Sequence, residues 1–296
     1  MNVLVVGEAL VDVVHRDDGS VETHAGGSPY NVARGLARLG VDTHLICQFA
    51  DDDHGRLLAE GLEESNVHHT GPDSATHRTS SAVAQIADDG SATYEFDLTW
   101  APSSLPDPGA FAALHVGSLG TLLEPGAAQV SDLVVTADVL GVPVSFDPNV
   151  RLSVVAEPAI WQAVFARFAP HARIVKMSDE DAAVLFPDVA PLDLARRLAS
   201  EGALVAITQG AGGALVAHQD ELAVIEAPSI EVVDTIGAGD TFMAAMLAWS
   251  ASYDWPVATE LDVTELFDLG TYAARAAAIT CSRAGADLPW IEEIGG

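Results

Sequence analysis

The chain has 296 residues, of which 49% are hydrophobic, and its 13 Lys and Arg residues stand against 43 Asp and Glu residues, a formal net charge of −30 at pH 7. A protein of this charge repels the phosphates of a nucleic acid, and no basic patch interleaved with aromatic residues is present, so nucleic acid is not expected as a partner. No apolar run approaches the ~18 residues that a membrane span needs, which excludes an integral membrane protein.

The chain opens with MNVLVVGEALVDVV, which lacks a basic region and contains Glu8 and Asp12. We therefore expect no signal peptide, no membrane association and a cytoplasmic location. Residues 2–7 predict a buried strand. Residues 28–40 predict a helix, because their apolar side chains recur at helical spacing before a glycine.

The alternation of strands and helices continues along the chain, with short junctions marked by Gly or Pro. Strands are predicted at 43–50, 113–119, 142–147, 173–178 and 203–210, and helices at 53–67, 127–141, 159–169 and 180–186. This order indicates an α/β fold with a mostly parallel central sheet and helices on both faces. The length favours a single domain, residues 1–296, with a small appendage.

Two segments depart from that alternation and read as β-hairpins. They are residues 12–24 and residues 77–98, the second with DDG at its tip. We expect them to pair into a small sheet over one edge of the core. In an enzyme with a small substrate such a sheet is a lid that excludes water, and the alternative is a purely structural edge decoration.

The histidines and cysteines carry little chemical signal. The ten histidines show no HExxH or comparable spacing, and the pair His68 and His69 only follows a helix end, so the sequence predicts no structural metal site. Cys47 and Cys281 lie in apolar surroundings and are expected to be buried, reduced thiols.

The stretch DTIGAGDTF, residues 234–242, combines a glycine turn with two aspartates. Gly237, Ala238 and Gly239 would form the amino-terminal turn of an apolar helix, where unpaired N–H groups and the helix dipole attract an anion such as a phosphoryl group. Asp240, at the edge of that site, could accept a proton from an attacking hydroxyl. The alternative is a tight turn with an N-capping aspartate, and Asp234 would cap the loop or help to hold a cation.

Other phosphate-binding loops are excluded by the sequence. The chain has a single lysine, Lys176, which is preceded by Ile and Val, so a GxxxxGK[ST] loop is impossible. Neither Gly-Ala-Gly segment completes a GxGxxG pattern, because Leu215 and Phe242 occupy the last positions. Phosphates must then be held mainly by backbone groups, Mg²⁺ and arginine.

These residues resemble the PfkB, or ribokinase-like, family of carbohydrate kinases. DTIGAGDTF resembles the family's carboxy-terminal motif, and AGGSPYNVARGLARLG (25–40) resembles its amino-terminal glycine motif. Further similarity lies in VVGEALVD, FDPNVR, KMSDED, TQGAGGA and SRAGADLPW, so the resemblance spans nearly the whole chain. It implies a ribokinase-like fold with a β lid, ATP and Mg²⁺ as cofactors, and transfer of a phosphoryl group to a sugar hydroxyl.

The resemblance also implies roles for individual residues. Asp240 would be the catalytic base, and Gly237, Ala238 and Gly239 would form the anion hole. Sugar hydroxyls would contact Asp12, Gly26, Gly27 and Asn31, and the nucleotide would lie beside Thr208, Gly210 and Gly285. Arg151 would pair with a phosphate or substrate charge, against the alternative of a surface salt bridge.

One position departs from the family pattern. Family members often carry an Asn and a Glu, three residues apart, that help to organise Mg²⁺ and phosphate, and the matching residues here are Ser178 and Asp181. Asp181 would then assist Mg²⁺ indirectly, a role that its shorter side chain puts in question. A similar serine is found in fructokinase-like members. The resemblance adds a candidate K⁺ site beside Asp234 and a candidate homodimer contact through the lid.

The resemblance leaves several functions open. GEALVD, GGSPYNVA and FDPNVR are most similar to the fructokinase subgroup. A 2-keto-3-deoxygluconate kinase would need a cation near the lid, where Arg16 and Arg78 are outnumbered by acidic residues, so a neutral sugar is favoured. Ribose or a nucleoside is a third acceptor. A sugar-binding regulator without catalysis is a hypothesis from a different class, but it would not need the base in GAGD.

Overall fold

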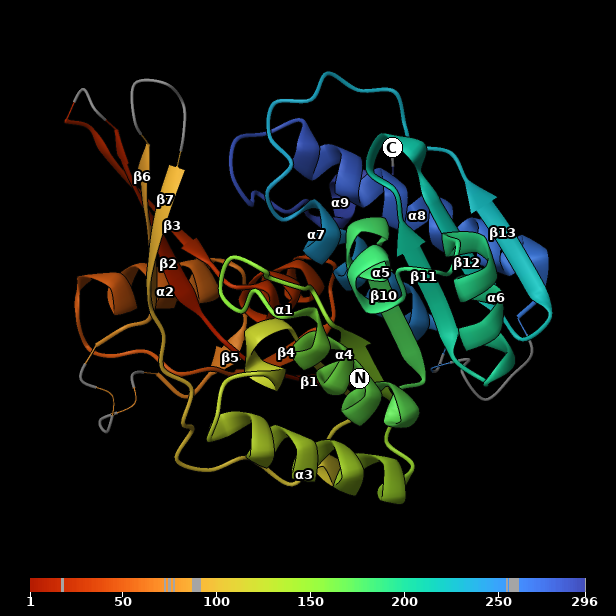
Figure 1. Ribbon diagram of the computed structural model, residues 1–296, viewed down its shortest axis with the longest axis horizontal. Helices are drawn as coiled ribbons and strands as arrows, with labels where there is room; N and C mark the ends of the chain where they lie inside the picture. Colours follow the sequence, from red (N-terminus) through yellow and green to blue (C-terminus); the bar gives the residue numbers. More distant parts are fainter. Residues whose placement is uncertain are drawn as a thin grey trace.

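The computed structural model describes residues 1–16, 19–71, 73, 76, 78–86, 92–253, 255 and 261–295. Its centre is a nine-stranded sheet with the order β13-β12-β11-β10-β9-β8-β1-β4-β5 (Figure 1). The strands are β1 (Asn2–Val6), β4 (Asp42–Ile46), β5 (His68–His69), β8 (Ala113–Gly117), β9 (Val144–Asp147), β10 (Ile174–Ser178), β11 (Leu204–Thr208), β12 (Ala214–His218) and β13 (Glu221–Ile225). From β5 to β11 all pairings are parallel, as the alternation of strands and helices predicts.

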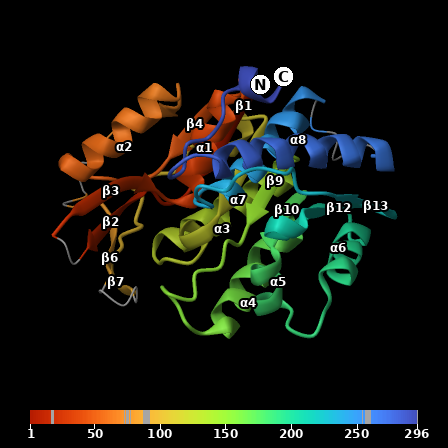
Figure 2. The same cartoon turned by 90° about the horizontal axis from the view of Figure 1, so that it is seen from above.

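Helices cover both faces of the sheet, because successive side chains of a central strand point to opposite faces. In β1, Val3 and Val5 belong to one hydrophobic core, and Leu4 and Val6 to the other. One face is covered by α1 (Ser28–Arg38), α2 (Asp53–Glu64), α7 (Ala238–Ser252) and α8 (Val263–Cys281). The other is covered by α3 (Gly126–Leu140), α4 (Pro158–Phe168), α5 (Asp179–Leu185) and α6 (Pro191–Ser200). Figure 2 shows these three layers.

The sheet ends in an antiparallel hairpin that the sequence analysis did not anticipate. β12 runs antiparallel to β11 and to β13, with the turn at Gln219, whose φ is +54°. Every residue of β12 is buried, so it shows neither the alternation of a surface strand nor a helical spacing. A buried apolar run therefore concealed both the strand and its direction.

A separate four-stranded sheet, with the order β3-β2-β6-β7, projects from one side of the molecule (Figure 1). It contains β2 (Leu10–Arg16), β3 (Val21–Gly26), β6 (Ser81–Ile86) and β7 (Ala92–Asp97), and a parallel pairing of β2 with β6 joins the two predicted hairpins. His77 and the DDG tip of the predicted segment 77–98 lie outside the described residues. The function of this sheet as a lid, and as the contact of a homodimer, stays a prediction.

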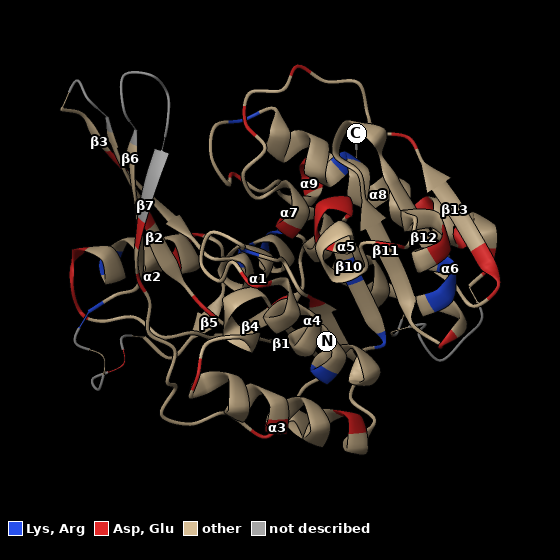
Figure 3. Ribbon diagram, in the orientation of Figure 1, with Lys and Arg blue, Asp and Glu red and all other residues tan. Residues whose placement is uncertain are grey.

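The cysteines are unpaired, and acidic residues are spread over the whole described structure. Both cysteines are free, but only Cys47 is buried, whereas Cys281 at the end of α8 is partly exposed. Figure 3 shows Asp and Glu residues over helices, strands and loops alike, with few Lys and Arg residues between them. Within the described part of the chain, no helix combines the length and apolar character needed to cross a membrane.

Candidate active site

Buried carboxylates mark one region of the molecule. Among the described residues, the only buried acidic side chains are those of Glu8, Asp147, Asp181 and Asp240. Glu8 follows β1, Asp147 is the last residue of β9, and Asp181 lies in the first turn of α5, directly after β10. All three therefore lie at the carboxyl ends of parallel strands. Ligand sites of open α/β sheets form at that edge. Burial of charge is costly, and such clusters are typical of functional sites.

Asp240 lies in the first turn of α7, with its carboxylate against the beginning of α1. Its Oδ1 accepts a hydrogen bond from Ser28 Oγ at 2.6 Å, and its Oδ2 accepts one from Asn31 Nδ2 at 2.8 Å. Ser28 and Asn31 are three residues apart and share one side of α1. The sequence analysis placed Asn31 at the sugar but foresaw neither its contact with Asp240 nor the role of Ser28.

The glycine turn precedes α7 as predicted. Gly237 has a φ of 77° and is the N-cap residue, and no side chain of the described residues caps the helix. A Cβ atom at Gly237 would stand 2.8 Å from Ala286 Cβ, so a side chain would meet both strain and a clash. The N–H of Ala238 donates to Thr235 O at 3.3 Å, a long hydrogen bond. The amino end of α7 can thus receive an anion.

Lys176 lies beside this turn and was not predicted as a site residue. A Cβ atom at Gly239 would stand 2.9 Å from Lys176 Nζ, which donates to Asp147 Oδ2 at 2.8 Å. Burial acts to lower the pKa of Lys176, but the carboxylates of Asp147, Asp181 and Asp240 outweigh it and raise that pKa above its ordinary value. Lys176 is therefore a fixed positive charge next to the anion site. A lone lysine in the middle of a buried strand is the signal that could have identified it.

Ser178 and Asp181 form a capping box at the beginning of α5. Ser178 Oγ accepts from the N–H of Asp181, and Asp181 Oδ2 accepts from the N–H of Ser178, both at 2.9 Å. Asp181 Oδ1 also accepts from the N–H of Val150 at 2.8 Å. Thr208, in β11, is the register partner of Ser178. The carboxylate of Asp181 therefore joins α5 to the loop that carries Arg151.

Asp12 and the glycines 26 and 27 lie together at the base of the second sheet. A Cβ atom at Gly26 would stand 2.6 Å from Asp12 Oδ2, and one at Gly27 would stand 2.7 Å from the backbone oxygen of Glu8. At Gly27, where the neighbour is backbone and φ is +103°, only glycine permits this close approach. Asp12 is exposed, but neighbouring protein atoms partly desolvate it and raise its pKa, against the opposing effects of His24 and Arg151.

The side chain of Arg151 is exposed, and it forms no ion pair with any described residue. Its Nη1 donates to the backbone oxygen of Val150, and its charge acts on both Glu8 and Asp12. The surface salt bridge considered as an alternative is thus absent from the described part of the chain. Arg151 is available to a charged ligand.

Asp234 caps the loop, one of the two roles predicted for it. Its Oδ1 accepts from the N–H of Ile236 at 3.0 Å, and its Oδ2 from the N–H of Gly285 at 2.9 Å. Partial burial acts to raise the pKa of Asp234, but these and other backbone hydrogen bonds outweigh it and hold the pKa below its ordinary value. Gly210 and Gly285, predicted near the nucleotide, both have positive φ and open space where a Cβ atom would be.

The donor set around Lys176 fits a nucleotide phosphate better than a metal held by protein alone. The ammonium group and the uncapped end of α7 offer positive charge to an anion. Asp181 is the buried carboxylate that the sequence predicted for Mg²⁺, but both of its oxygens already accept backbone hydrogen bonds. Mg²⁺ readily keeps water ligands, so these residues fit an ion held mainly by phosphates and reached by Asp181 through water.

Comparisons with known proteins also indicate a protein that binds a nucleotide phosphate. A model of the pfkB family of carbohydrate kinases matches residues 1–293. Fructokinase from Salmonella typhimurium is 33% identical over 297 residues, which cover 96% of this chain and 94% of that protein. The structure of a fructokinase from Vibrio cholerae with fructose, ADP and a potassium ion bound has a TM-score of 0.79 at 27% identity, covering 96% of this chain and 93% of the other. Aminoimidazole riboside kinase from Salmonella enterica, complexed with aminoimidazole riboside and an ATP analogue, has a TM-score of 0.82 at 25% identity, covering 100% and 99%.

Proposed function

Because the chain belongs to the pfkB family of carbohydrate kinases and is therefore a sugar phosphotransferase, we propose that it is an ATP-dependent fructokinase. The observation that carries the proposal is the buried carboxylate of Asp240, held by Ser28 and Asn31 at the uncapped end of α7. A base and an anion site lie there side by side, which is the arrangement that phosphoryl transfer to a hydroxyl requires.

Asp240 acts as the base. The two hydrogen bonds from α1 fix both of its oxygens, and each oxygen keeps a lone pair for a hydroxyl of the sugar. When that hydroxyl attacks phosphorus, its proton passes to the carboxylate. Asn31 Oδ1 is buried and has no partner among the described residues, so a sugar hydroxyl or a water can satisfy it.

Lys176 and the amino end of α7 receive the charge of the phosphoryl group. Lys176 is held by Asp147 and needs no rearrangement during the reaction, which is the condition for efficient electrostatic stabilisation. We place the nucleotide phosphates along Gly237, Gly239 and Lys176, and the rest of the nucleotide toward Thr208, Gly210 and Gly285. Mg²⁺, when bound, neutralises phosphate charge, with Asp181 assisting through water.

The second sheet bears on the choice of sugar. Asp12 and Gly26, at its base, offer a carboxylate and bare backbone, which suit the hydroxyl groups of fructose. Arg78 is paired with Asp97 at 2.8 Å, and this acidic neighbour makes it a less favourable partner for the carboxylate of 2-keto-3-deoxygluconate. The side chain of Arg16 lies outside the described set. A neutral acceptor is preferred, with Arg151 assigned to a phosphate rather than to a substrate carboxylate.

A nucleoside is the second acceptor class, and the likeness to aminoimidazole riboside kinase favours it. A regulator without catalysis is disfavoured by the buried carboxylate of Asp240 and its two fixed donors, because a protein that only binds a sugar does not need a base there. The K⁺ bound in the Vibrio cholerae fructokinase supports K⁺ as a cofactor here. Its location beside Asp234 stays a prediction.

The test is phosphorylation by Mg·ATP of fructose, 2-keto-3-deoxygluconate, ribose, adenosine and aminoimidazole riboside. We expect the highest kcat/KM with fructose. A higher kcat/KM with another acceptor would change the proposed substrate but would leave the assignment as a kinase intact. Sugar binding without turnover of ATP would instead favour the regulator.

A further inference from the structure

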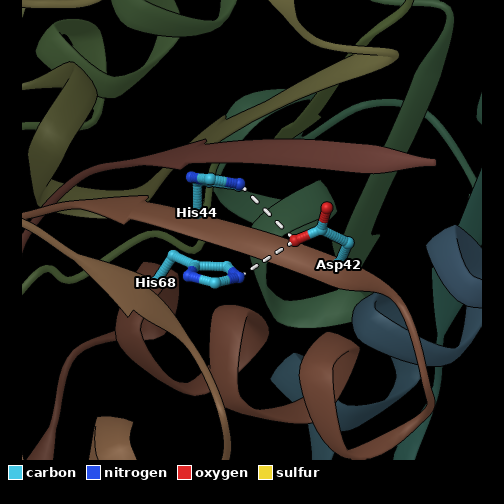
Figure 4. Close-up of side chains that lie close together, drawn as sticks. All are labelled: Asp42, His44 and His68. Atoms are coloured by element: carbon cyan, nitrogen blue, oxygen red, sulfur yellow. Dashed lines mark ion pairs between the residues drawn. The ribbon is translucent and has the colours of Figure 1, made fainter.

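Asp42, His44 and His68 come together at the edge of the main sheet, far apart in the sequence. His44 of β4 and His68 of β5 are register partners in a parallel pairing, and Asp42 lies two residues before His44, on the same face of β4. The distance from Asp42 Oδ1 is 3.5 Å to His44 Nε2 and 3.3 Å to His68 Nε2. In Figure 4 both imidazole rings direct a nitrogen toward the carboxylate.

The two rings are ordered by their neighbours. They stack on each other with centroids 4.6 Å apart and an interplanar angle of 24°, and Phe111 meets His44 edge-on at 5.3 Å. All three side chains remain open to solvent, with exposed fractions of 52% for Asp42, 36% for His44 and 65% for His68. The cluster is therefore held in place on one side and accessible from the other.

We propose that Asp42, His44 and His68 form a binding site for a divalent transition-metal ion, with Zn²⁺ as the best candidate. The two nitrogens and the carboxylate oxygen lie within 4.8 Å of one another, and among the described residues no other three His, Cys, Asp or Glu side chains are grouped in this way. Two ligands on a tetrahedral Zn²⁺ are about 3.4 Å apart, given Zn–N distances near 2.1 Å. Small rotations of these exposed side chains provide that separation.

The ligand types select the metal. Imidazole nitrogens favour Zn²⁺, Ni²⁺, Co²⁺ and Cu²⁺ over Mg²⁺ and Ca²⁺, which prefer oxygen. Water would complete the coordination on the exposed side. The net charge of −30 adds a general attraction for cations, which is the same for every divalent ion and so does not produce this selectivity.

The site is separate from the candidate active site. Asp42 and His44 lie on β4 and His68 on the edge strand β5, whereas Lys176 lies on β10, with β9, β8 and β1 between them. Asp240 lies in the first turn of α7. A bound ion would join β4 to β5, which has only two residues and pairs with the sheet only through β4. Its effect would be to hold that edge segment in place and to stabilise the folded chain by mass action.

The test is isothermal titration of the untagged, nucleotide-free protein with ZnCl₂. We expect one tightly bound ion per chain, and at least a ~10-fold loss of affinity in His44→Gln and in His68→Gln, because each removes a ligand. His171→Gln is the matched control, since His171 pairs with a single carboxylate, Asp138, at 2.8 Å. Its affinity should equal that of the wild type.

Thermal unfolding separates loss of the site from loss of the fold. In EDTA the variants should unfold at the wild-type temperature, and Zn²⁺ should raise the Tm of the wild type and of His171→Gln only. Equal Zn²⁺ affinity in all proteins, or an equal rise of Tm with Ca²⁺, would overturn the proposal. If His44→Gln unfolds early in EDTA, Asp42→Asn serves in its place, because it keeps both rings.

Discussion

The ammonium group of Lys176 lies against the backbone of Gly239, 2.9 Å from the point where a Cβ atom of residue 239 would stand. Lys176 cannot yield easily, because its side chain is 4% exposed and its Nζ is held by Asp147 at 2.8 Å. The contact joins the middle of β10 to the first turn of α7. It places a fixed positive charge where the glycine turn is open to an anion.

Gly239→Ala should lower kcat by at least ~10-fold, and Gly239→Val by more, because even a methyl group displaces Lys176 or blocks approach of the phosphate, and misplacement by ~1 Å can cost 10²-fold. The measurement is kcat together with Tm. A loss of kcat at nearly unchanged Tm is the expected result. Wild-type turnover in Gly239→Val would contradict the anion site.

Asp240→Asn should lower kcat by at least ~10²-fold while nucleotide binding is largely retained, because the substitution removes the base and keeps the shape. The fold should tolerate it, since Asn31 can turn its unpartnered Oδ1 toward the new amide. Asp268→Asn, which changes an exposed carboxylate of α8, is the control and should leave kcat unchanged. Near-normal turnover in Asp240→Asn would contradict the assignment of Asp240 as the catalytic base.

Lys176→Met should reduce the free energy of unfolding by about 3–5 kcal/mol, because it leaves the carboxylate of Asp147 buried without its partner. The double variant with Asp147→Asn should recover much of that loss, since the amide oxygen can still accept from the N–H of Asn149. Turnover should stay low in both variants. Denaturant unfolding and kcat measure the two effects, and recovery of turnover in the double variant would reduce Lys176 to a structural role.

Local patterns in the sequence were sufficient for six parallel strands of the main sheet, β1, β4 and β8 to β11, and for the glycine turn. The alternating strands and helices predicted the parallel order, and GAGD predicted the beginning of α7 next to an aspartate. These features depend on residues near each other in the chain, where periodicity and turn chemistry are informative. The resemblance to a family then supplied the roles that the pattern alone left open.

What the sequence did not reveal depends on contacts between distant segments. Ser28 meets Asp240 across 212 positions, and Lys176 meets Asp147 across 29. Asp42, His44 and His68 become neighbours only through the pairing of β4 with β5. The capping box of Ser178 and Asp181 is different, since Ser-x-x-Asp before an apolar run was readable locally. These two residues were interpreted as counterparts of the family's Asn and Glu near Mg²⁺, and their capping role was not predicted.

Glu8 should make stability decrease with rising pH. Burial raises the pKa of this carboxyl from 4.5 to about 7, although Ser118 and the N–H of Gly120, 2.7 Å from Oε2, act in the opposite direction. Between these pH values the unfolded chain has lost the proton and the folded chain still holds it, so the folded state becomes less stable as pH rises. The difference corresponds to about 3 kcal/mol in total.

Glu8→Gln isolates this contribution, because the amide keeps an acceptor for Gly120 but does not titrate near neutral pH. The free energy of unfolding of the wild type, minus that of Glu8→Gln, should fall by about 3 kcal/mol from pH 4.5 to pH 7 and then level off. Denaturant titrations at several pH values measure it. Parallel profiles for the two proteins would show that Glu8 keeps an ordinary pKa in the folded state.

Salt should stabilise the protein, because nearly all of the acidic residues that the structure describes lie outside the core. Of the described acidic side chains only four are buried, so the net charge of −30 is largely a surface charge that repels itself. The Debye length falls from about 30 Å at 0.01 M to about 3 Å at 1 M, which removes most of that repulsion. The chain has a single lysine beside 43 Asp and Glu residues, so few positive charges offset that repulsion.

Melting temperature and turnover should therefore be followed in KCl, NaCl and choline chloride from about 0.05 to about 3 M, a range over which screening changes most strongly at the lower end. General screening predicts a higher Tm with every salt. A specific K⁺ site beside Asp234 predicts that K⁺ alone raises turnover at low concentration.

Because the carboxylate of Asp234 already accepts backbone hydrogen bonds from Ile236 and Gly285, an ion there would have to share its oxygens. The K⁺ effect should accordingly depend on the loop as a whole, and Asp234→Asn should weaken it without changing the rise of Tm in choline chloride. Flat curves in all three salts would contradict both ideas.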